Sequence, residues 1–170
     1  YGWVGAVWCG RDHADKGSSL FDGVSFGLGG ADNFPVAPTA QFANELWTAY
    51  LGDLVFKCNV VLQQVAHDST GTAEAVKASA IGEARFLRGY AYFTLVRLFG
   101  NVPIIDSVLT IQNSVVPQST PEQVYAFIEQ DLQYAAANLP ISYDPKFIGR
   151  ATTGAANGML AKVYLYEKKW

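Results

Sequence analysis

Residues 80–98 predict a helix that is apolar around nearly its whole circumference. One set of apolar side chains recurs at helical spacing, at Ala80, Ala84, Leu87, Ala91, Leu95 and Leu98. A second set covers much of the other side: Phe86, Tyr90, Phe93 and Val96. A helix of this kind is stable only when neighbouring elements surround it. The stretch therefore predicts the central helix of an all-α core.

Charged residues lie on the same predicted helix, at Glu83, Arg85, Arg88 and Arg97. Charged side chains are rarely buried without partners. Asp131 interrupts another predicted apolar helix in the same way, so we expect Arg85 or Arg88 to form a buried ion pair with it. A guanidinium can hold a carboxylate by two parallel hydrogen bonds. We interpret this pair as structural.

Three further helices are predicted, over residues 41–67, 120–139 and 152–168. With the central helix they form two long antiparallel pairs, and stacked pairs of the tetratricopeptide type are the architecture that this pattern favours. Residues 1–40 are rich in Gly, Asp and Pro and show no sustained helical period, so they predict an irregular segment.

Particular residues mark the ends of these helices. Thr120 and Gln123 have the spacing of a capping box and predict the beginning of the third helix. Thr72 is the expected N-cap of the central helix, and Gly100 followed by Pro103 predicts its end. The predicted inward positions of the first helix include Phe42, Leu46, Tyr50 and Phe56, interrupted by Asp53. Those of the fourth helix are Ala156, Leu160, Val163 and Leu165.

Three sequence motifs resemble those of one known family. The first is Glu83-Ala84-Arg85-Phe86-Leu87-Arg88, then Tyr92-Phe93, then Phe99-Gly100-Asn101-Val102-Pro103. The second is Asp131-Leu132 with Ala135 and Leu139-Pro140. The third is Gly149-Arg150-Ala151-Thr152 with Ala155-Ala156 and the run 160–166. In this order they resemble the SusD/RagB family, surface glycan-binding lipoproteins of the Bacteroidetes outer membrane.

The resemblance implies a non-catalytic protein that binds oligo- or polysaccharides at the cell surface. It would deliver them to a SusC-type TonB-dependent transporter in the outer membrane, and no cofactor is expected. Two alternatives stay open: the same scaffold binds peptides, or the chain is a helical-repeat adaptor that binds only proteins. An affinity test with glycans and peptides would separate them.

Family members are longer and begin with a lipoprotein signal, so the chain is expected to be a fragment of a longer SusD-like protein. Charged residues make up only 16% of the chain, which is low for a free-standing soluble domain and agrees with this expectation. Cys9 follows Trp8 where a lipoprotein cleavage site needs a small residue, so we do not expect it to be the lipid anchor. Membrane attachment would then use an anchor that this chain lacks.

Composition and spacing argue against several other functions. The net charge is −3 and no basic run occurs, so nucleic acid binding is not expected. His13 and His67 have no fixed partner in the sequence, and no metal site is predicted. Cys9 and Cys58 match no metal-ligand spacing, and we expect two reduced thiols. A disulfide between them in an oxidising compartment stays open as the alternative.

The candidates for ligand binding lie in the irregular segment. Sugars stack on aromatic rings and hydrogen-bond to planar amide or carboxylate groups, and Trp3, Trp8, Asn33 and Phe34 are residues of these kinds. The alternative is that these aromatic side chains only pack the segment onto the helices.

Overall fold

The computed structural model describes residues 41–169, and these form an all-α fold with one short two-stranded ladder. The main helices are α3 (Gln41–Trp47), α4 (Phe56–Ala66), α5 (Glu74–Phe99), α6 (Pro121–Asn138) and α7 (Thr153–Tyr166). A π-helical segment, η3 (Thr48–Val55), joins α3 to α4. The predicted fold class is therefore confirmed, whereas the predicted irregular segment 1–40 lies outside the described residues.

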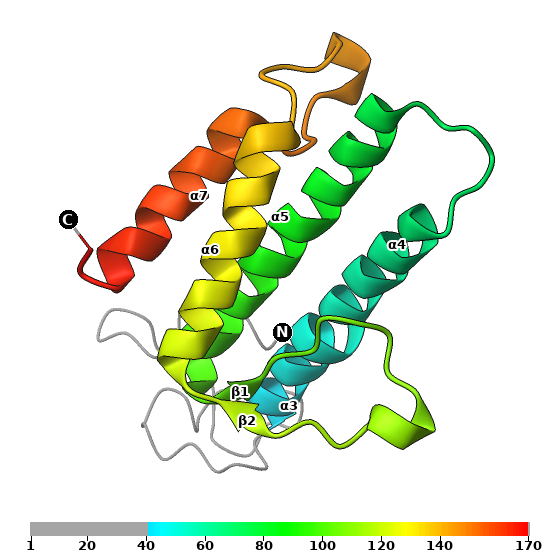
Figure 1. The fold of residues 1–170 in the computed structure, drawn as a ribbon. Helices are drawn as coiled ribbons and strands as arrows, with labels where there is room; N and C mark the ends of the chain where they lie inside the picture. Colours follow the sequence, from blue (N-terminus) through cyan, green and yellow to red (C-terminus); the bar gives the residue numbers. More distant parts are fainter. Residues whose placement is uncertain (1–40, 170) are drawn as a thin grey trace, which may run out of the picture. The chain divides into compact units, whose positions relative to one another are not determined.

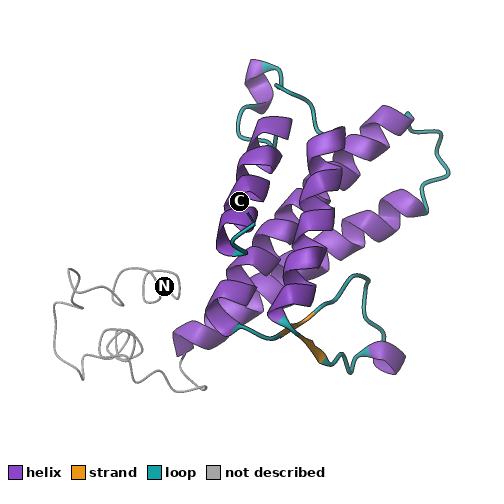
Figure 2. Ribbon diagram, turned by 60° about the vertical axis from the view of Figure 1, so that its left-hand side comes forward, coloured by secondary structure: helices purple, strands orange, loops and turns teal. Residues whose placement is uncertain are grey.

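The chain divides into two units, Tyr1–Ala49 and Tyr50–Trp170. The second unit contains α4 to α7, arranged as antiparallel neighbours in chain order (Figure 1). Helix α5 packs against both α4 and α6, and α7 packs mainly on α6. Figure 2 shows the same helices from a second direction.

The π-helical segment changes which face of the first helical run is buried. Its buried residues are Phe42, Leu46, Leu51, Val55, Cys58 and Asn59. The step of five positions from Leu46 to Leu51 matches the wider turn of a π-helix, after which the buried face continues at normal spacing. The predicted stripe is therefore wrong beyond this point. Phe56 is 49% exposed, and Asp53 forms an exposed ion pair with Lys57.

Helix α5 is enclosed on all sides only over one short stretch. Residues 91–96 are all buried, as the apolar circumference predicts. Leu87 and Leu98, predicted to face inward, are 43% and 42% exposed. The reason is that α4 and α6 cover only part of the helix, and apolar spacing alone does not say on which sides a neighbour exists.

The capping box of α6 is confirmed. The Thr120 hydroxyl accepts a hydrogen bond from the Gln123 backbone N–H, and the Gln123 side chain accepts one from the Thr120 N–H at 2.9 Å. The Thr72 cap is wrong, since Ala73 is the N-cap of α5 and makes no side-chain cap. The Asp68 carboxylate instead accepts hydrogen bonds from the backbone and hydroxyl of Thr70, and these bonds lower the pKa of Asp68.

Helix α7 begins where predicted, because the Thr152 hydroxyl accepts a hydrogen bond from the Ala155 N–H at 3.2 Å. Its buried residues are Ala156 and Val163, seven positions apart. Leu165, predicted to face inward, is 61% exposed. A helix that packs mainly on one neighbour buries only a narrow stripe, and Leu165 lies outside it.

The chain between α5 and α6 is closed at its base by a short ladder. Strand β1 (Val102–Pro103) pairs antiparallel with β2 (Gln118–Ser119), and Val102 lies opposite Ser119. Between the strands lies a 3-10 turn, η4 (Ile111–Asn113). A second 3-10 turn, η5 (Pro145–Phe147), lies in the connection from α6 to α7.

Candidate functional site

The centre of the helical unit holds a buried ion pair between α5 and α6. Arg88 Nε donates to Asp131 Oδ2 at 2.7 Å, and Arg88 Nη2 donates to Asp131 Oδ1 at 2.9 Å. Arg88 is 4% exposed and Asp131 is 1% exposed. The two parallel hydrogen bonds give the carboxylate a planar, bidentate partner, which is the geometry that compensates best for removing both charges from water.

Helix α4 contributes a third member of this group, Asn59. Its Oδ1 accepts a hydrogen bond from Arg88 Nη1 at 2.7 Å. Arg88 Nη1 also donates to the backbone carbonyl of Asp106 at 3.2 Å, and the Phe127 ring lies 4.8 Å from the Arg88 guanidinium carbon. Each nitrogen of the guanidinium therefore has a partner inside the protein.

The same group holds the backbone of the chain that follows α5. Asn59 Nδ2 donates to the carbonyls of Ile105 at 2.9 Å and Ser107 at 3.2 Å. The Tyr92 hydroxyl accepts from the Ile105 N–H at 2.7 Å and lies 3.3 Å from the Ile105 carbonyl. We call Asn59, Arg88, Tyr92 and Asp131 the buried polar cluster. It joins three helices to residues 103–107.

Replacement of Tyr92 by phenylalanine tests this attachment. Tyr92 is fully buried, and burial raises the pKa of its phenol to about 12. Loss of the hydroxyl leaves the Ile105 N–H without its acceptor, so we expect the free energy of unfolding to fall by about 1–3 kcal/mol. Hydrogen exchange at Ile105 should accelerate. The control is Tyr164→Phe, whose hydroxyl accepts an exposed hydrogen bond from Gln133. An equal loss of unfolding free energy in the Tyr92→Phe and Tyr164→Phe variants would contradict the prediction.

Arg85 is the other arginine predicted to pair with Asp131, and it lies at the edge of the cluster. Its Nε is 3.9 Å from Asp131 Oδ1, and its side chain is 34% exposed. The guanidinium lies 4.3 Å from the centre of the Tyr134 ring. The Arg85 Nε is buried and has no hydrogen-bond partner. Arg88 therefore makes the bidentate pair, and Arg85 adds a longer-range charge.

A second, more exposed cluster links α5 to the connection between α6 and α7. Glu83 Oε1 accepts hydrogen bonds from the Tyr143 hydroxyl at 2.7 Å and from Arg150 Nε at 2.8 Å. The Arg150 guanidinium also lies 4.7 Å from the Tyr143 ring centre. This cluster joins the first sequence motif to the third, as Arg88 and Asp131 join the first to the second.

Cys58 is a buried free thiol close to the polar cluster. Burial raises the pKa of this thiol to about 11 from its ordinary value of 9.0; the nearby charges have smaller effects, since Arg88 lowers the pKa and Asp131 raises it. Because the folded state favours the protonated thiol, its contribution to stability is present below pH 9.0 and is lost as the pH rises through about 11. Cys9 lies outside the described residues.

We therefore expect Cys58 to react slowly with a thiol reagent at pH 8 in a Cys9→Ser protein, and rapidly once urea unfolds it. A Cys58→Ala variant should show a shallower loss of stability between pH 9 and pH 11, measured by urea unfolding at each pH. Equal reaction rates with and without urea would contradict this prediction.

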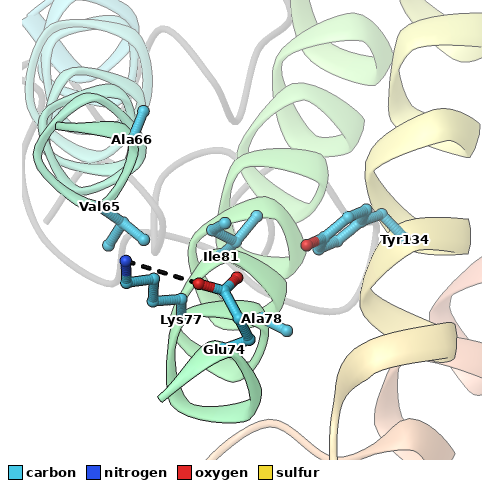
Figure 3. Close-up of a pocket in the computed structure, with 7 residues that line it drawn as sticks. All are labelled: Val65, Ala66, Glu74, Lys77, Ala78, Ile81 and Tyr134. Carbon is cyan, nitrogen blue, oxygen red and sulfur yellow. Dashed lines mark ion pairs between the residues drawn. The ribbon is translucent and has the colours of Figure 1, made fainter. Parts of the chain in front are cut away.

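The described residues also line an open hollow between α4, α5 and α6 (Figure 3). Its volume is about 300 Å³, and its lining consists of Val65, Ala66, Glu74, Lys77, Ala78, Ile81 and Tyr134. Lys77 Nζ lies 3.6 Å from Glu74 and 3.4 Å from Asp68, so the lining charges already pair. One face of the Tyr134 ring is occupied by Arg85. These features suit the hollow poorly for sugar binding.

The four candidate ligand residues, Trp3, Trp8, Asn33 and Phe34, lie outside the described residues. Within residues 41–169 no group of three or more His, Cys, Asp or Glu side chains could hold a metal ion. In the same range no helix is both long and apolar enough to span a membrane. Asn59 and Tyr143 are site residues that sequence reasoning missed, because their partners are distant in the chain.

The chain is similar to known proteins over most of its length. A SusD-like family model, described as starch-binding associating with outer membrane, matches residues 31–165. A SusD-like protein of Bacteroides ovatus is 38% identical over 139 residues, which is 81% of this chain and 25% of that protein. The chain therefore spans about a quarter of the length of this curated relative.

Solved structures of the same family are also similar. A laminarin-binding SusD-like protein has a TM-score of 0.86 and 34% identity, covering 99% of this chain and 35% of that one. A structure with a xylogluco-oligosaccharide has a TM-score of 0.76 and 34% identity, covering all of this chain and 32% of that one.

Proposed function

The chain belongs to the SusD-like family, and from this membership we propose that it is the helical part of a non-catalytic glycan-binding protein of the cell surface. The observation that carries the proposal is the likeness to the laminarin-binding protein, which extends over nearly the whole chain. The ligand class is therefore an oligo- or polysaccharide. No metal or organic cofactor is required for such binding.

In this proposal the buried polar cluster is a scaffold and does not contact the ligand. Arg88 and Asp131 satisfy each other, and both are almost fully buried. A sugar needs exposed aromatic faces and free hydrogen-bonding groups, which this cluster does not offer. The role of the first motif is to fix the helices and the adjoining loop in place.

Ligand contact is instead proposed for Trp3, Trp8, Asn33 and Phe34. Their support is chemical: indole and phenyl rings stack on pyranose faces, and a planar amide hydrogen-bonds to hydroxyl groups. The exposed Tyr166 ring of the described unit is not proposed as a ligand contact. It packs edge-to-face on Phe93, with 5.1 Å between the two ring centres.

Affinity electrophoresis of the protein as its cells make it tests the function. Gels containing laminarin, xyloglucan or starch should retard the protein in at least one case. Trp3→Ala or Trp8→Ala should reduce the retardation, whereas Tyr166→Ala should leave it unchanged. No retardation by any glycan, together with peptide binding in calorimetry, would replace this function by peptide binding.

The proposed location is the outer membrane, with the protein exposed at the surface through a lipid anchor, and the proposed partner is a SusC-type TonB-dependent transporter. Fractionation of cells and protease treatment of intact cells test the location. Co-purification with the transporter, identified by mass spectrometry, distinguishes an importer component from a general adaptor protein.

A further inference from the structure

Three members of the buried polar cluster hydrogen-bond in series, and each comes from a different helix. Asp131 lies on α6, Arg88 on α5 and Asn59 on α4. All three are almost fully buried. Asp131 and Asn59 share Arg88 as their hydrogen-bond partner. Because these groups are removed from bulk water, each depends on its partners in the series.

The first link of the series fixes the plane of the Arg88 guanidinium. The Asp131 carboxylate accepts from Nε at 2.7 Å and from Nη2 at 2.9 Å. A planar group held at two of its nitrogens cannot turn without losing both hydrogen bonds. The remaining nitrogen, Nη1, is thereby directed at Asn59 Oδ1, 2.7 Å away, and at the Asp106 carbonyl, 3.2 Å away.

The second link determines the orientation of the Asn59 amide. A guanidinium can only donate and a backbone carbonyl can only accept, whereas an asparagine amide accepts at one end and donates at the other. Arg88 therefore requires the Asn59 oxygen on its side. Nδ2 then faces the carbonyls of Ile105 at 2.9 Å and Ser107 at 3.2 Å. The reverse orientation would place donor against donor and oxygen against two carbonyl oxygens.

The series ends on three consecutive backbone carbonyls at the start of the loop between β1 and β2. Those of Ile105 and Ser107 accept from Asn59, and that of Asp106 accepts from Arg88. Backbone carbonyls need hydrogen-bond donors when they lie against the protein interior. The path of residues 105–107 is therefore defined by where these two side chains present their N–H groups.

We propose that Asp131, Arg88 and Asn59 form a relay through which the position of α6 controls the position of residues 105–107. Asp131 orients Arg88, Arg88 orients the Asn59 amide, and the amide holds the backbone. A shift of α6 along α5 would release this backbone, although a carboxylate cannot itself hydrogen-bond to a carbonyl. The relay requires no bound ligand and is independent of the proposed function.

Hydrogen exchange at the Ile105 N–H, which donates to Tyr92, tests the relay in the protein as its cells make it. Asn59→Asp keeps the size of the side chain but removes both donors. Exchange at Ile105 should accelerate about tenfold or more, as for the loss of one buried hydrogen bond, while the amides of α6 stay protected. Asn138→Asp is the matched control, because its Nδ2 donates to the Tyr134 carbonyl at 2.8 Å, and it should leave Ile105 unchanged.

A double-mutant cycle distinguishes the relay from two independent contacts. Asn59→Ala and Asp131→Asn should each accelerate exchange at Ile105 about tenfold, as one buried hydrogen bond is lost or misdirected. The double variant should exchange no faster than the faster single variant, because both changes interrupt the same series. Independent contacts would instead multiply the two effects.

Three results would overturn the relay. The first is unchanged exchange at Ile105 in Asp131→Asn, and the second is a multiplied effect in the double variant. The third is equal acceleration at Ile105 and throughout α6, because the loop would then only follow general unfolding. If Asp131→Asn does not fold, Asn59→Asp decides alone: unchanged exchange at Ile105 overturns the relay, and selective acceleration there supports it.

Discussion

Replacing Asp131 by alanine is expected to lower the free energy of unfolding by about 3–5 kcal/mol. The change leaves the Arg88 guanidinium buried and without its bidentate carboxylate, and only Asn59 and one backbone carbonyl remain as partners. Domains are typically stable by only about 5–15 kcal/mol, so this loss is a large fraction of the total. Urea unfolding followed by circular dichroism measures it.

Two variants show whether the effect arises from an uncompensated charge. Arg88→Met/Asp131→Leu removes both charges and should be less destabilised than Asp131→Ala alone. Asp53→Ala breaks an exposed ion pair with Lys57 and should cost less than about 1 kcal/mol. If Asp131→Ala cost no more than Asp53→Ala, the cluster would not be a scaffold.

The second large effect is expected for Gly89→Leu, where α5 lies close against α6. A Cβ atom at Gly89 would lie 3.2 Å from the Leu132 Cγ and 3.6 Å from the Asp131 Cβ. A leucine would force the two helices apart, next to the ion pair. Overpacking of this kind costs about 1–3 kcal/mol or more, and the strain on the ion pair adds to it.

Gly158→Leu is the matched control for this prediction. Gly158 lies in α7, and an added Cβ there would have no atom within 4 Å. The same substitution should therefore stabilise the protein slightly, since glycine is a poor helix former by roughly 1 kcal/mol. Thermal unfolding of the two variants should shift in opposite directions, and shifts of the same sign would argue against close packing at Gly89.

The helices could be predicted because their signals are local. The Thr120 capping box and the apolar circumference of residues 91–96 need no knowledge of the rest of the fold. Charge interrupting an apolar helix also identified Arg88 and Asp131 as residues that need partners. Which arginine makes the bidentate pair depends on helix rotation, which spacing alone does not define.

Other features depend on distant contacts and left no local signal. Asn59 binds backbone carbonyls of a loop 46 and 48 positions away, and a carbonyl is the same in every residue type. The π-helical turn changes the helix period, so Phe56 lies on the exposed side. Leu165 has the spacing of a buried residue but no neighbour in the described unit covers it fully.

Helix α5 takes part in two long-range ion pairs, Arg88 with Asp131 and Glu83 with Arg150. Natural variation should therefore be correlated: a relative that loses the acid at position 131 should also lose the base at position 88. The same constraint applies to chimaeras. An α6 that lacks the aspartate, placed beside an α5 that carries the arginine, would leave that buried guanidinium without its carboxylate partner. Within this unit, α6 and α5 are therefore best exchanged between relatives together.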